Sequence, residues 1–571
     1  MNYDPAKPLI VQSDLTMLLE VDSSRYDEVR DAIAPFSEII KSPEHVHTYR
    51  MTPISLWNAA SAGLSASEVM RRLLTYSRFE ISASTLTQIK ELMGRYGQIK
   101  MEPYDGEHLK LITSTPVLMS RFFRIDEIHF YLMEKISPTE ALIKSIHRGL
   151  VKQALIKEGY PVMDLAGYTK GADLEIEFKP DVYLRPYQCR SRDSFLKGGS
   201  HLGGCGVVVL PCGAGKTIVG MAVMAEMKTH TLILVTGTTA ARQWRQELLN
   251  KTSVPQENIG EFTGAVKEIK PVTIATYHIL THRHPQEDEF IHFDRINNHS
   301  WGLIIYDEVH LLPAQMFRFT ASLQAIRRLG LTATLVREDN KESDVFSLIG
   351  PKSYDLAWKE VERQGWIAKG YCHEIRVDMD PAMTMAYVTS PKRQRFRTAS
   401  ENPAKKDVIK QLLSCHNDES VLIIGQYLSQ LQQMAEALSF PLITGQTPQE
   451  EREILYAKFK SGAIKTLIVS SVANFSIDLP DASVAIQISG KFGSRQEEAQ
   501  RLGRILRPKA DHNVARFYTL VSAGTEEQDF ALNRQLFLTE QGYSYTILHE
   551  DELEPYFNEN TVAAVKEARD G

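Results

Sequence analysis

Cysteines are few in this 571-residue sequence, and long apolar stretches are missing. There are five cysteines and no Cys-x-x-Cys pair, so we expect neither a disulfide framework nor a zinc site. No apolar run approaches the ~20 residues that a membrane-spanning helix requires. The first residues, MNYDPAKPLIVQSD, lack the basic and apolar regions of a secretory signal. These absences predict a soluble protein of the reducing cytoplasm that does not contact a membrane.

An excess of positive charge is also missing. The formal net charge is −6, which argues against a protein that coats nucleic acid by bulk electrostatic attraction. It does not exclude a protein that grips a nucleic-acid strand inside a local groove. Hydrophobic residues make up 43% and charged residues 24% of the chain, as in ordinary globular proteins. The length predicts three or four domains of ~150 residues each.

Near-continuous apolar runs alternate with helical stretches from about residue 181 onward. The first series is GVVVLP, TLILVT, VTIATY, WGLIIYDE and RRLGLTAT, and the second, after about residue 366, is SVLIIGQ, KTLIVSS, SVAIQIS and ARFYTLVS. Strands of this kind, separated by helices, are typical of parallel sheets covered on both faces. The sequence therefore predicts an α/β fold with two tandem doubly wound parallel-sheet domains, at residues 181–365 and 366–548.

The residues before these domains mix short apolar runs with amphipathic helical patterns. We expect two small α+β domains here, at residues 1–104 and 105–180. The stretch SASEVMRRLLTYSRF has apolar residues at helical spacing, and either Ser65 or Ser67 can cap it. The final residues, 549–571, are acidic and are expected to form a mobile tail.

A glycine-bearing loop joins the first apolar strand to a helical stretch, in GVVVLPCGAGKT at residues 206–217. Backbone N–H groups and a helix N-terminus in this arrangement form a cradle for phosphate. Lys216 would reach the β- and γ-phosphates of a nucleotide, and Thr217 would hold Mg²⁺. Leu210 replaces the first glycine of the strict motif, and a plain glycine-rich turn is the alternative. The predicted ATP-binding residues of the loop are Pro211, Cys212, Gly213, Ala214, Gly215, Lys216 and Thr217.

An acidic pair, Asp307 and Glu308, follows the apolar strand WGLIIY. Asp307 would orient Mg²⁺, and Glu308 would position and deprotonate the attacking water. His310 would sense the γ-phosphate and relay its state to the second sheet domain. Taken alone, such a pair could be a solvated turn. Downstream of GAGKT, it predicts the metal and base positions of an ATP-hydrolysing site.

The segment YLRPYQ, upstream of the loop, contains groups that can recognise adenine. The Gln188 amide can read the adenine edge through a paired donor and acceptor. A neighbouring aromatic ring can stack on the base, and Arg185 is assigned to the same site. The alternative is the ordinary start of an amphipathic helix.

Late in the chain, QRLGRILR at residues 500–507 places two arginines three positions apart. On a helix, Arg504 and Arg507 share one face. A pair of guanidiniums there can neutralise the charge that develops during phosphoryl transfer. Because the pair belongs to the second sheet domain, catalysis would require the two domains to close, which converts hydrolysis into motion. The alternative is a solvated basic helix.

The ordered segments LPCGAGKT, DEVH, GLTATL and QRLGRILR resemble the motifs of superfamily 2 helicases. GLTATLVREDN carries Arg337-Glu338-Asp339 directly after its Thr-Ala-Thr segment, which is similar to the RED element of the XPB family. VFSLIGPKSYDLAWKEVERQGWIA and GSRQEEAQRLGRILRPK are also similar to XPB proteins, most of all to the bacterial members. LIVQSDLTMLLEV and APFSEIIKSPEHVHTYRMTP resemble the N-terminal domain of that family, so the resemblance spans nearly the whole chain.

The resemblance implies two RecA-like motor domains and an ATP-dependent 3′→5′ DNA helicase or duplex translocase that acts in DNA repair, such as nucleotide excision repair. It implies ATP and Mg²⁺ as cofactors, and it implies that residues 105–180 are a small domain like a damage-recognition domain. The roles carried over by position are adenine recognition by Gln188; the ATP site at Lys216, Thr217, Asp307 and Glu308; coupling to DNA by Thr332 and Thr334; completion of the site by Gln500, Arg504 and Arg507; and action on the duplex at the fork by Arg337, Glu338 and Asp339.

XPB proteins carry a thumb-like insertion in the second motor domain, and the best candidate here lies near residues 385–405. Residues 390–410 hold seven basic and two acidic residues. Phe396 lies beside Arg395 and Arg397, and Arg393 precedes them, a pattern that suits phosphate contact combined with base stacking. The alternative is a solvated basic loop.

The floor of a DNA groove is expected from loops at the carboxyl ends of strands in both sheet domains. Hydroxyls, amides and backbone N–H groups can hold phosphates without net positive charge, which reconciles the charge of −6 with a DNA substrate. Such contacts predict weak sequence preference, and each residue could equally belong to an ordinary loop. The candidates are Arg242, Thr276, Tyr277, Gln426, Ser471 and Asn474.

Three functions remain open from the sequence: a helicase that separates strands, a duplex translocase that remodels or loads a partner with little unwinding, and an ATP-gated scaffold whose N-terminal 180 residues recruit repair proteins. The expected partners are single-stranded and forked duplex DNA and a nuclease or another repair protein. We expect a monomer that works in the cytoplasm, in association with the nucleoid. The second sheet domain and its arginines disfavour a small-molecule P-loop kinase.

Overall fold

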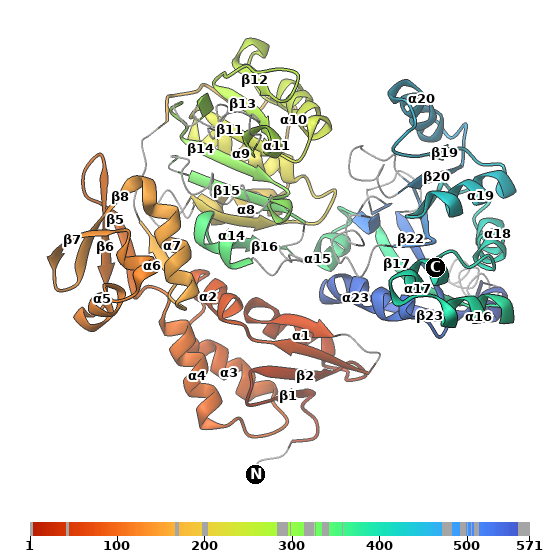
Figure 1. The fold of residues 1–571 in the computed structure, drawn as a ribbon, viewed down its shortest axis with the longest axis horizontal. Coiled ribbons are helices and arrows are strands. Elements are labelled where there is room, and N and C mark those ends of the chain that lie inside the picture. Colours follow the sequence, from red (N-terminus) through yellow and green to blue (C-terminus); the bar gives the residue numbers. More distant parts are fainter. Residues whose placement is uncertain are drawn as a thin grey trace. The chain divides into compact units, whose positions relative to one another are not determined.

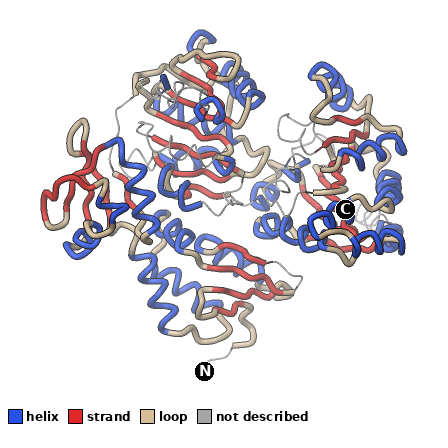
Figure 2. Tube along the Cα trace, in the orientation of Figure 1, coloured by secondary structure: helices blue, strands red, loops and turns tan. Residues whose placement is uncertain are grey.

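The computed structural model divides the chain into two compact units (Figure 1). The first comprises Met1–Leu210 and Gly215–Leu356, and the second comprises Pro211–Ala214 and Ala357–Gly571. Figure 2 shows the helices and strands of both units. The described residues are 4–41, 45–165, 171–196, 204–281, 295–296, 299–312, 325, 327–333, 342–356, 358–470, 482–490, 498, 501–503, 505–506 and 513–557.

A four-stranded antiparallel sheet in the order β1-β2-β4-β3 begins the chain. Burial alternates along β2, as expected where one face of a sheet covers a core. Helix α3 begins after Ser65, whose side chain accepts the backbone N–H of Glu68, so the first of the two predicted capping serines is confirmed. The elements are β1 (Leu9–Val11), β2 (Thr16–Glu20), α1 (Tyr26–Ile33), β3 (Glu38–Lys41), β4 (Val46–Arg50), α2 (Pro53–Ser61), α3 (Ala66–Tyr76) and α4 (Ala83–Gly94).

A five-stranded sheet in the order β7-β8-β6-β5-β9 follows. Its strands pair antiparallel, except that β5 and β9 are parallel. Three helices accompany the sheet, and its buried side chains form one core. The elements are β5 (Ile99–Pro103), β6 (His108–Thr113), α5 (Pro116–Phe122), α6 (Asp126–His129), β7 (Leu132–Ser137), β8 (Glu140–Lys144), α7 (Arg148–Lys157) and β9 (Val162–Asp164).

The predicted bounds of this second domain are wrong at both ends. Strand β5 pairs with β6, so a boundary between residues 104 and 105 would cut a hairpin, and the domain begins before Ile99. The Asp105 carboxylate accepts two backbone N–H groups of that hairpin turn, which stabilises the turn. At the other end, Asp173 and Phe178 form isolated bridges with Thr229 and Thr252, so the stretch from residue 171 belongs with the next domain.

Seven parallel strands in the order β12-β13-β11-β14-β15-β10-β16 form the sheet of the next domain. Every residue of β11 and β13 is buried, as expected for strands covered on both faces. The first predicted series of strands is thereby confirmed. The elements are α8 (Pro186–Leu196), β10 (Cys205–Val209), α9 (Lys216–Met227), β11 (Thr231–Val235), α10 (Thr238–Lys251), β12 (Ile259–Phe262), β13 (Val272–Thr276), α11 (Tyr277–Thr281), β14 (Leu303–Asp307), β15 (Arg327–Thr332), α14 (Glu342–Leu348) and β16 (Lys352–Asp355).

The two small N-terminal domains pack on this parallel-sheet domain through helices α2, α7 and α14, which Figure 1 shows side by side. Trp57, Ile156 and Phe346 form one buried cluster, with 6.2 Å between the Trp57 and Phe346 rings. The Asn58 Oδ1 atom accepts the backbone N–H of Lys352 at 3.0 Å. The three domains of the first unit therefore share an apolar contact and are not joined by linkers alone.

The second unit contains another seven-stranded parallel sheet, in the order β19-β20-β18-β21-β22-β17-β23. The predicted second series of strands corresponds to β18, β20, β21 and β22 and is confirmed. The elements are α15 (Trp358–Arg363), β17 (Lys369–Val377), α16 (Pro381–Thr389), α17 (Lys392–Ser400), α18 (Lys405–Cys415), β18 (Val421–Gly425), α19 (Leu428–Leu438), β19 (Leu442–Ile443), α20 (Gln449–Lys460), β20 (Thr466–Ser470), β21 (Val484–Gln487), β22 (Val514–Ser522), α23 (Glu526–Glu540) and β23 (Tyr545–His549).

The predicted mobile tail is wrong for its first residues. Strand β23 is an edge strand of the second sheet, and a short 3-10 helix, Glu550–Glu552, follows it. Tyr556 and Phe557 pack against the core of this domain, and the Tyr556 hydroxyl is hydrogen bonded to His373 at 3.1 Å. The apolar side chains of this acidic segment therefore attach it to the sheet. The predicted start of the second domain at residue 366 is also late, because α15 belongs to the second unit.

No helix in the part of the chain that the structure describes has the length and apolar character needed to cross a membrane.

Candidate ATP-hydrolysis site

The glycine-bearing loop lies between β10 and α9, as the sequence predicts. Gly213 and Gly215 have φ values of +78° and +82°, in the left-handed region that favours glycine. Helix α9 begins at Lys216, directly after the second of these glycines. The first backbone N–H groups of the helix therefore follow the loop, which is the arrangement of an anion-binding cradle.

Gln188 lies against this loop. A Cβ atom added to Gly215 would lie 2.6 Å from the Gln188 Nε2 atom, so only glycine leaves room for the amide. The Gln188 Oε1 atom accepts the backbone N–H of Arg185 at 2.9 Å, which fixes the amide plane. Of the two tyrosines in the segment, Tyr187 is buried, whereas Tyr183 is 85% exposed and is the ring that can stack on a base.

The acidic pair lies at the carboxyl end of β14, within reach of the loop lysine. Lys216 Nζ is 3.3 Å from the Glu308 Oε1 atom. Glu308 has a φ of +48°, a conformation that is uncommon for non-glycine residues. The two oxygens of Asp307 have separate donors, because Trp244 Nε1 donates to Oδ2 at 2.8 Å and the Glu308 N–H donates to Oδ1 at 3.1 Å.

The pKa values of Asp307 and Glu308 are shifted in opposite directions. Burial, together with the neighbouring charge of Glu308, raises the pKa of Asp307 to about 6. Burial also opposes ionisation of Glu308, but the charges of Lys216 and His310 outweigh it and hold the pKa of Glu308 below its usual value. The cationic neighbours thus favour the ionised form of Glu308, whereas burial and the charge of Glu308 disfavour ionisation of Asp307.

His310 connects this acidic end to the neighbouring strand. Its Nδ1 atom is 2.6 Å from the Thr332 hydroxyl at the end of β15 and 3.4 Å from the Glu308 Oε2 atom. All three residues lie at the same edge of the first parallel sheet. His310 therefore contacts the predicted base directly, and Thr332 is connected to it through His310.

The oxygen atoms at this edge fit Mg²⁺. Asp307 supplies a carboxylate whose pKa is raised, and Thr217 supplies a hydroxyl in the first turn of α9, and both are hard oxygen ligands. Among the described residues, no group of three or more His, Cys, Asp or Glu side chains gathers to hold a metal ion.

Trp244 was missed from the sequence, and the prediction for Tyr277 is wrong. The Tyr277 side chain is 2% exposed, and its hydroxyl donates to the Asp307 carbonyl at 2.8 Å. Tyr277 therefore stabilises the backbone at the acidic pair. Thr276 is also buried, so neither side chain presents a surface to DNA. Trp244 and Tyr277 come from α10 and α11, and no local pattern links these helices to β14.

The other groove candidates differ in exposure. Arg242 is exposed in the first turn of α10. Gln426 is half-buried directly after β18, and its backbone N–H donates to Ser489 at 2.8 Å. Its Oε1 atom is buried and has no hydrogen-bond partner among the residues that the structure describes. Both residues remain candidates for contact with DNA.

The predicted thumb-like segment is a pair of helices, α16 and α17, and the prediction for Phe396 is wrong. Phe396 is 2% exposed and contacts Phe530 of α23 at 4.9 Å, so it belongs to a core and cannot stack on a base. Arg395 donates to backbone carbonyls at the end of α16, and Arg397 pairs with Glu401 at 3.0 Å. Arg393 is exposed. The helix directs these side chains to different faces, so they do not form one surface.

Nine predicted site residues lie outside the described residues: Thr334, Arg337, Glu338, Asp339, Ser471, Asn474, Gln500, Arg504 and Arg507.

A phosphate-binding loop and an acidic strand end at one edge of a parallel sheet, followed by a second parallel-sheet domain, define a tandem RecA-like motor protein of the helicase class. Family models agree with this class. "Type III restriction enzyme, res subunit" matches residues 181–337, and "ERCC3/RAD25/XPB C-terminal helicase" matches residues 361–570. "Helicase conserved C-terminal domain" matches residues 9–137, in the two small N-terminal domains.

Relatives match almost the full length of the chain. A protein of Kineococcus radiotolerans named "DNA 3'-5' helicase XPB" is 51% identical over 548 residues, which cover 96% of this chain and 97% of the relative. A protein of Mycobacterium tuberculosis with the same name is 50% identical and covers 96% and 98% of the two chains. The Saccharomyces cerevisiae "General transcription and DNA repair factor IIH helicase/translocase subunit XPB/SSL2" is 32% identical, covering 95% and 72%. The chain belongs to the XPB family of helicases.

Proposed function

We propose that this protein hydrolyses ATP on binding DNA and uses the energy to unwind or remodel duplex DNA in the 3′→5′ direction during DNA repair. The contact that supports this proposal most strongly is the 3.3 Å pair between Lys216 and Glu308 beside Asp307, at the edge that also holds Thr332. The two relatives that are about half identical are both named as 3′→5′ DNA helicases. The substrate would be single-stranded or forked duplex DNA.

The site residues divide the work of phosphoryl transfer. The phosphates of ATP would compete with Glu308 for the Lys216 ammonium, which would release the Glu308 carboxylate to orient and deprotonate water. Asp307 and Thr217 would hold Mg²⁺, which neutralises charge on the phosphates when it is bound. His310 and Thr332 would respond to the movement of Glu308, and Arg504 and Arg507 would stabilise the transferring group.

The packing of the N-terminal domains favours a motor over a tethered scaffold. These domains contact the first parallel-sheet domain through Trp57, Ile156 and Phe346, and Phe346 lies in α14. Helix α14 begins at Glu342, three residues after the Arg337-Glu338-Asp339 segment. We therefore propose that the N-terminal domains act on the duplex together with that segment. A duplex translocase with little strand separation is the other output that this arrangement allows.

The decisive measurement is ATP hydrolysis with no DNA and with single-stranded, duplex and forked DNA, combined with strand displacement on each tail polarity. We expect stimulation by DNA and displacement only from a 3′ tail. Displacement from a 5′ tail would contradict the polarity, and stimulation without displacement on any fork would indicate a translocase.

Replacing Glu308 by Gln tests the base within this assay. The variant should bind ATP but hydrolyse it ~10²- to 10⁴-fold more slowly, because general-base catalysis contributes that much. A fluorescent ATP analogue measures binding and phosphate release measures turnover. Glu247→Gln, on the outer part of α10 in a pair with Lys251, is the matched control. Loss of ATP binding in Glu308→Gln would instead assign Glu308 a structural role.

A further inference from the structure

Helix α23 carries two buried charged residues, Glu527 and Arg534, on one side. Glu527 and Arg534 lie two helical turns apart, so their side chains leave the helix on the same side. Each side chain is 1% exposed. Because a buried charge is tolerated only where a partner compensates it, the partners of these two residues identify what α23 holds in place.

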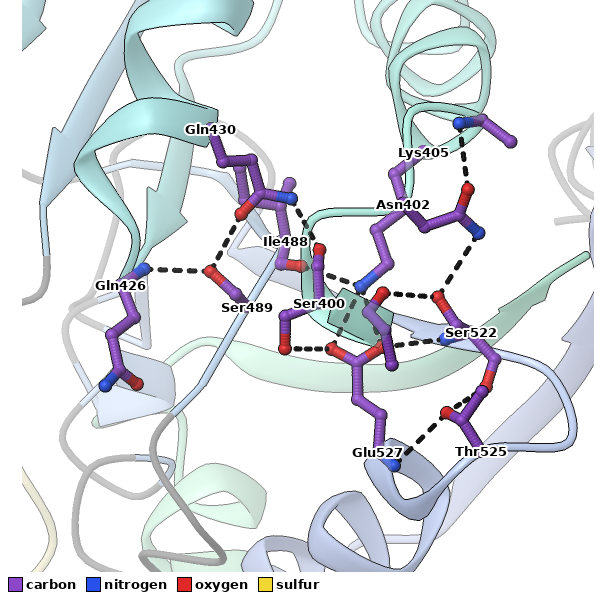
Figure 3. A network of polar contacts seen from close by, with 12 residues as sticks. Ser400, Asn402, Lys405, Gln426, Gln430, Ile488, Ser489, Ser522, Thr525 and Glu527 are labelled. Carbon is purple, nitrogen blue, oxygen red and sulfur yellow. Dashed lines mark hydrogen bonds and ion pairs between the residues drawn. The ribbon is translucent and has the colours of Figure 1, made fainter. Parts of the chain in front are cut away.

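Glu527 holds the first residue after β21. Both Glu527 oxygens lie 2.9 Å from Lys405 Nζ, and this ammonium also donates to the Ile488 carbonyl at 3.0 Å (Figure 3). Ser400 Oγ and the backbone N–H of Ser522 donate to the same carboxylate, at 3.1 and 2.9 Å. The Ile488 carbonyl is therefore attached to a saturated buried ion pair.

The next two residues are held as well. The Ser489 hydroxyl donates to Gln430 Oε1 at 3.0 Å and accepts the backbone N–H of Gln426 at 2.8 Å (Figure 3). Gly490 lies against Arg534, because a Cβ atom at this glycine would be 3.0 Å from the Arg534 Nε atom. Three successive residues after β21 are thus anchored to α18, α19 and α23.

Arg534 also forms an ion pair with Glu498, which lies further along the chain after Gly490. The Glu498 side chain is fully buried, and Arg534 Nε lies 3.5 Å from its Oε2 atom. The carboxylate also accepts from Gln487 Nε2 at 3.0 Å and from the Thr519 and Tyr545 hydroxyls at 3.3 Å. These partners come from β21, β22, β23 and α23, so Glu498 is fixed by four elements of the second domain.

The anchored residues alternate in sequence with those assigned to ATP hydrolysis. Glu498, Arg501 and Ile505 are buried and recur at helical spacing. Arg504 and Arg507 occupy positions between and after them in QRLGRILR. Loss of the buried contacts of Glu498 would therefore displace Arg504 and Arg507 without removing any group that binds ATP.

We propose that Glu498 and Arg534 are positioning residues for ATP hydrolysis, whose buried pair fixes the segment that carries Arg504 and Arg507. This rests on the proposed function, in which the two arginines stabilise phosphoryl transfer. Misplacing a catalytic group by about 1 Å lowers a rate on the order of 10²-fold. Loss of the pair therefore lowers kcat and leaves KM for ATP nearly unchanged.

The test compares full-length variants in DNA-stimulated ATP hydrolysis and in thermal unfolding. Glu498→Gln/Arg534→Met removes both charges and keeps the volume, so the fold is expected to survive. We expect kcat to fall on the order of 10- to 100-fold, with KM for ATP within about twofold of the wild type. Arg534→Lys keeps a positive charge beside Glu498 and should restore most of kcat. Arg534→Met alone leaves Glu498 its three neutral donors and gives the same comparison if the double variant folds poorly.

Val484→Ala, a core truncation in β21 without a polar link to the segment, is the control for lost stability. It should lower the unfolding temperature and retain kcat. An unchanged kcat in the charge-free double variant, or equal losses of kcat in Arg534→Lys and Arg534→Met, would overturn the proposal. Absence of DNA-stimulated ATP hydrolysis in the wild type would refute the proposed function itself, whereas full activity in both Arg504→Ala and Arg507→Ala would refute only the role of the two arginines and with it this proposal.

Discussion

The two seven-stranded sheets share one strand order. They differ in the charged groups that lie near the carboxyl ends of their strands. Counted along the chain within each sheet, the order is third, fourth, second, fifth, sixth, first and seventh in both. In the first sheet, Lys216, Asp307 and Glu308 meet one another with unbalanced charge. In the second sheet, Lys405 and Glu527 are fully buried and satisfy each other.

The connection after the first strand of each sheet shows the same difference. In the first sheet, β10 continues into the glycine loop and α9, whereas in the second sheet β17 continues into the helices α16 and α17. One scaffold therefore supports a glycine-bearing loop beside an acidic strand end in one domain and a fully buried ion pair in the other. Function in this chain follows from the groups at the strand ends and not from the fold, which both domains share.

The largest effect is expected from removing Lys216, the lysine of the glycine-bearing loop in the first parallel-sheet domain. Lys216→Ala should reduce DNA-stimulated ATP hydrolysis by at least ~10²- to 10³-fold, because the variant loses a charge directed at the transferring phosphate. Steady-state phosphate release measures the effect. Lys251→Ala, at the end of α10, should keep full activity. Retained turnover in Lys216→Ala would refute the phosphate-binding assignment.

A smaller effect on ATP hydrolysis is expected from changes in the Arg337-Glu338-Asp339 segment, which is assigned to strand separation. Arg337→Ala combined with Asp339→Ala should reduce unwinding of forked DNA more than it reduces ATP hydrolysis, because both residues are assigned to the fork. Parallel strand-displacement and phosphate-release assays measure the ratio. Equal losses in both activities would remove the case for a strand-separating element.

The smallest effect on DNA binding is expected in the helical insertion of the second domain. Phe396→Ala should lower the free energy of unfolding by ~3–5 kcal/mol, as other buried aromatic truncations do, and leave DNA affinity unchanged. Arg393→Ala should leave stability unchanged and reduce the salt dependence of DNA binding by about one ion if it contacts a phosphate. Urea unfolding and binding titrations at several salt concentrations separate these outcomes, and the reverse pattern would restore Phe396 as a DNA contact.

The sequence predicted whatever depends on local pattern. Apolar runs located the strands of both sheets, and the loop and strand motifs alone singled out Lys216, Asp307 and Glu308 as candidate site residues. Contacts between distant segments were not predictable in this way. Trp244 reaches Asp307 from α10, and Phe396 meets Phe530 of α23, and neither pairing leaves a periodic signal. The domain boundary at residue 104 was wrong because β5 and β6 pair with each other across it.

The positive φ of Glu308 carries a consequence for evolution of the chain. An L-residue in the left-handed region is disfavoured by roughly 1–2 kcal/mol, and glycine is not. A glycine at this position would relax the backbone while deleting the carboxylate beside Lys216. The residue therefore marks a stability–activity trade-off, in which the fold retains a locally unfavourable conformation because the side chain is needed at that point.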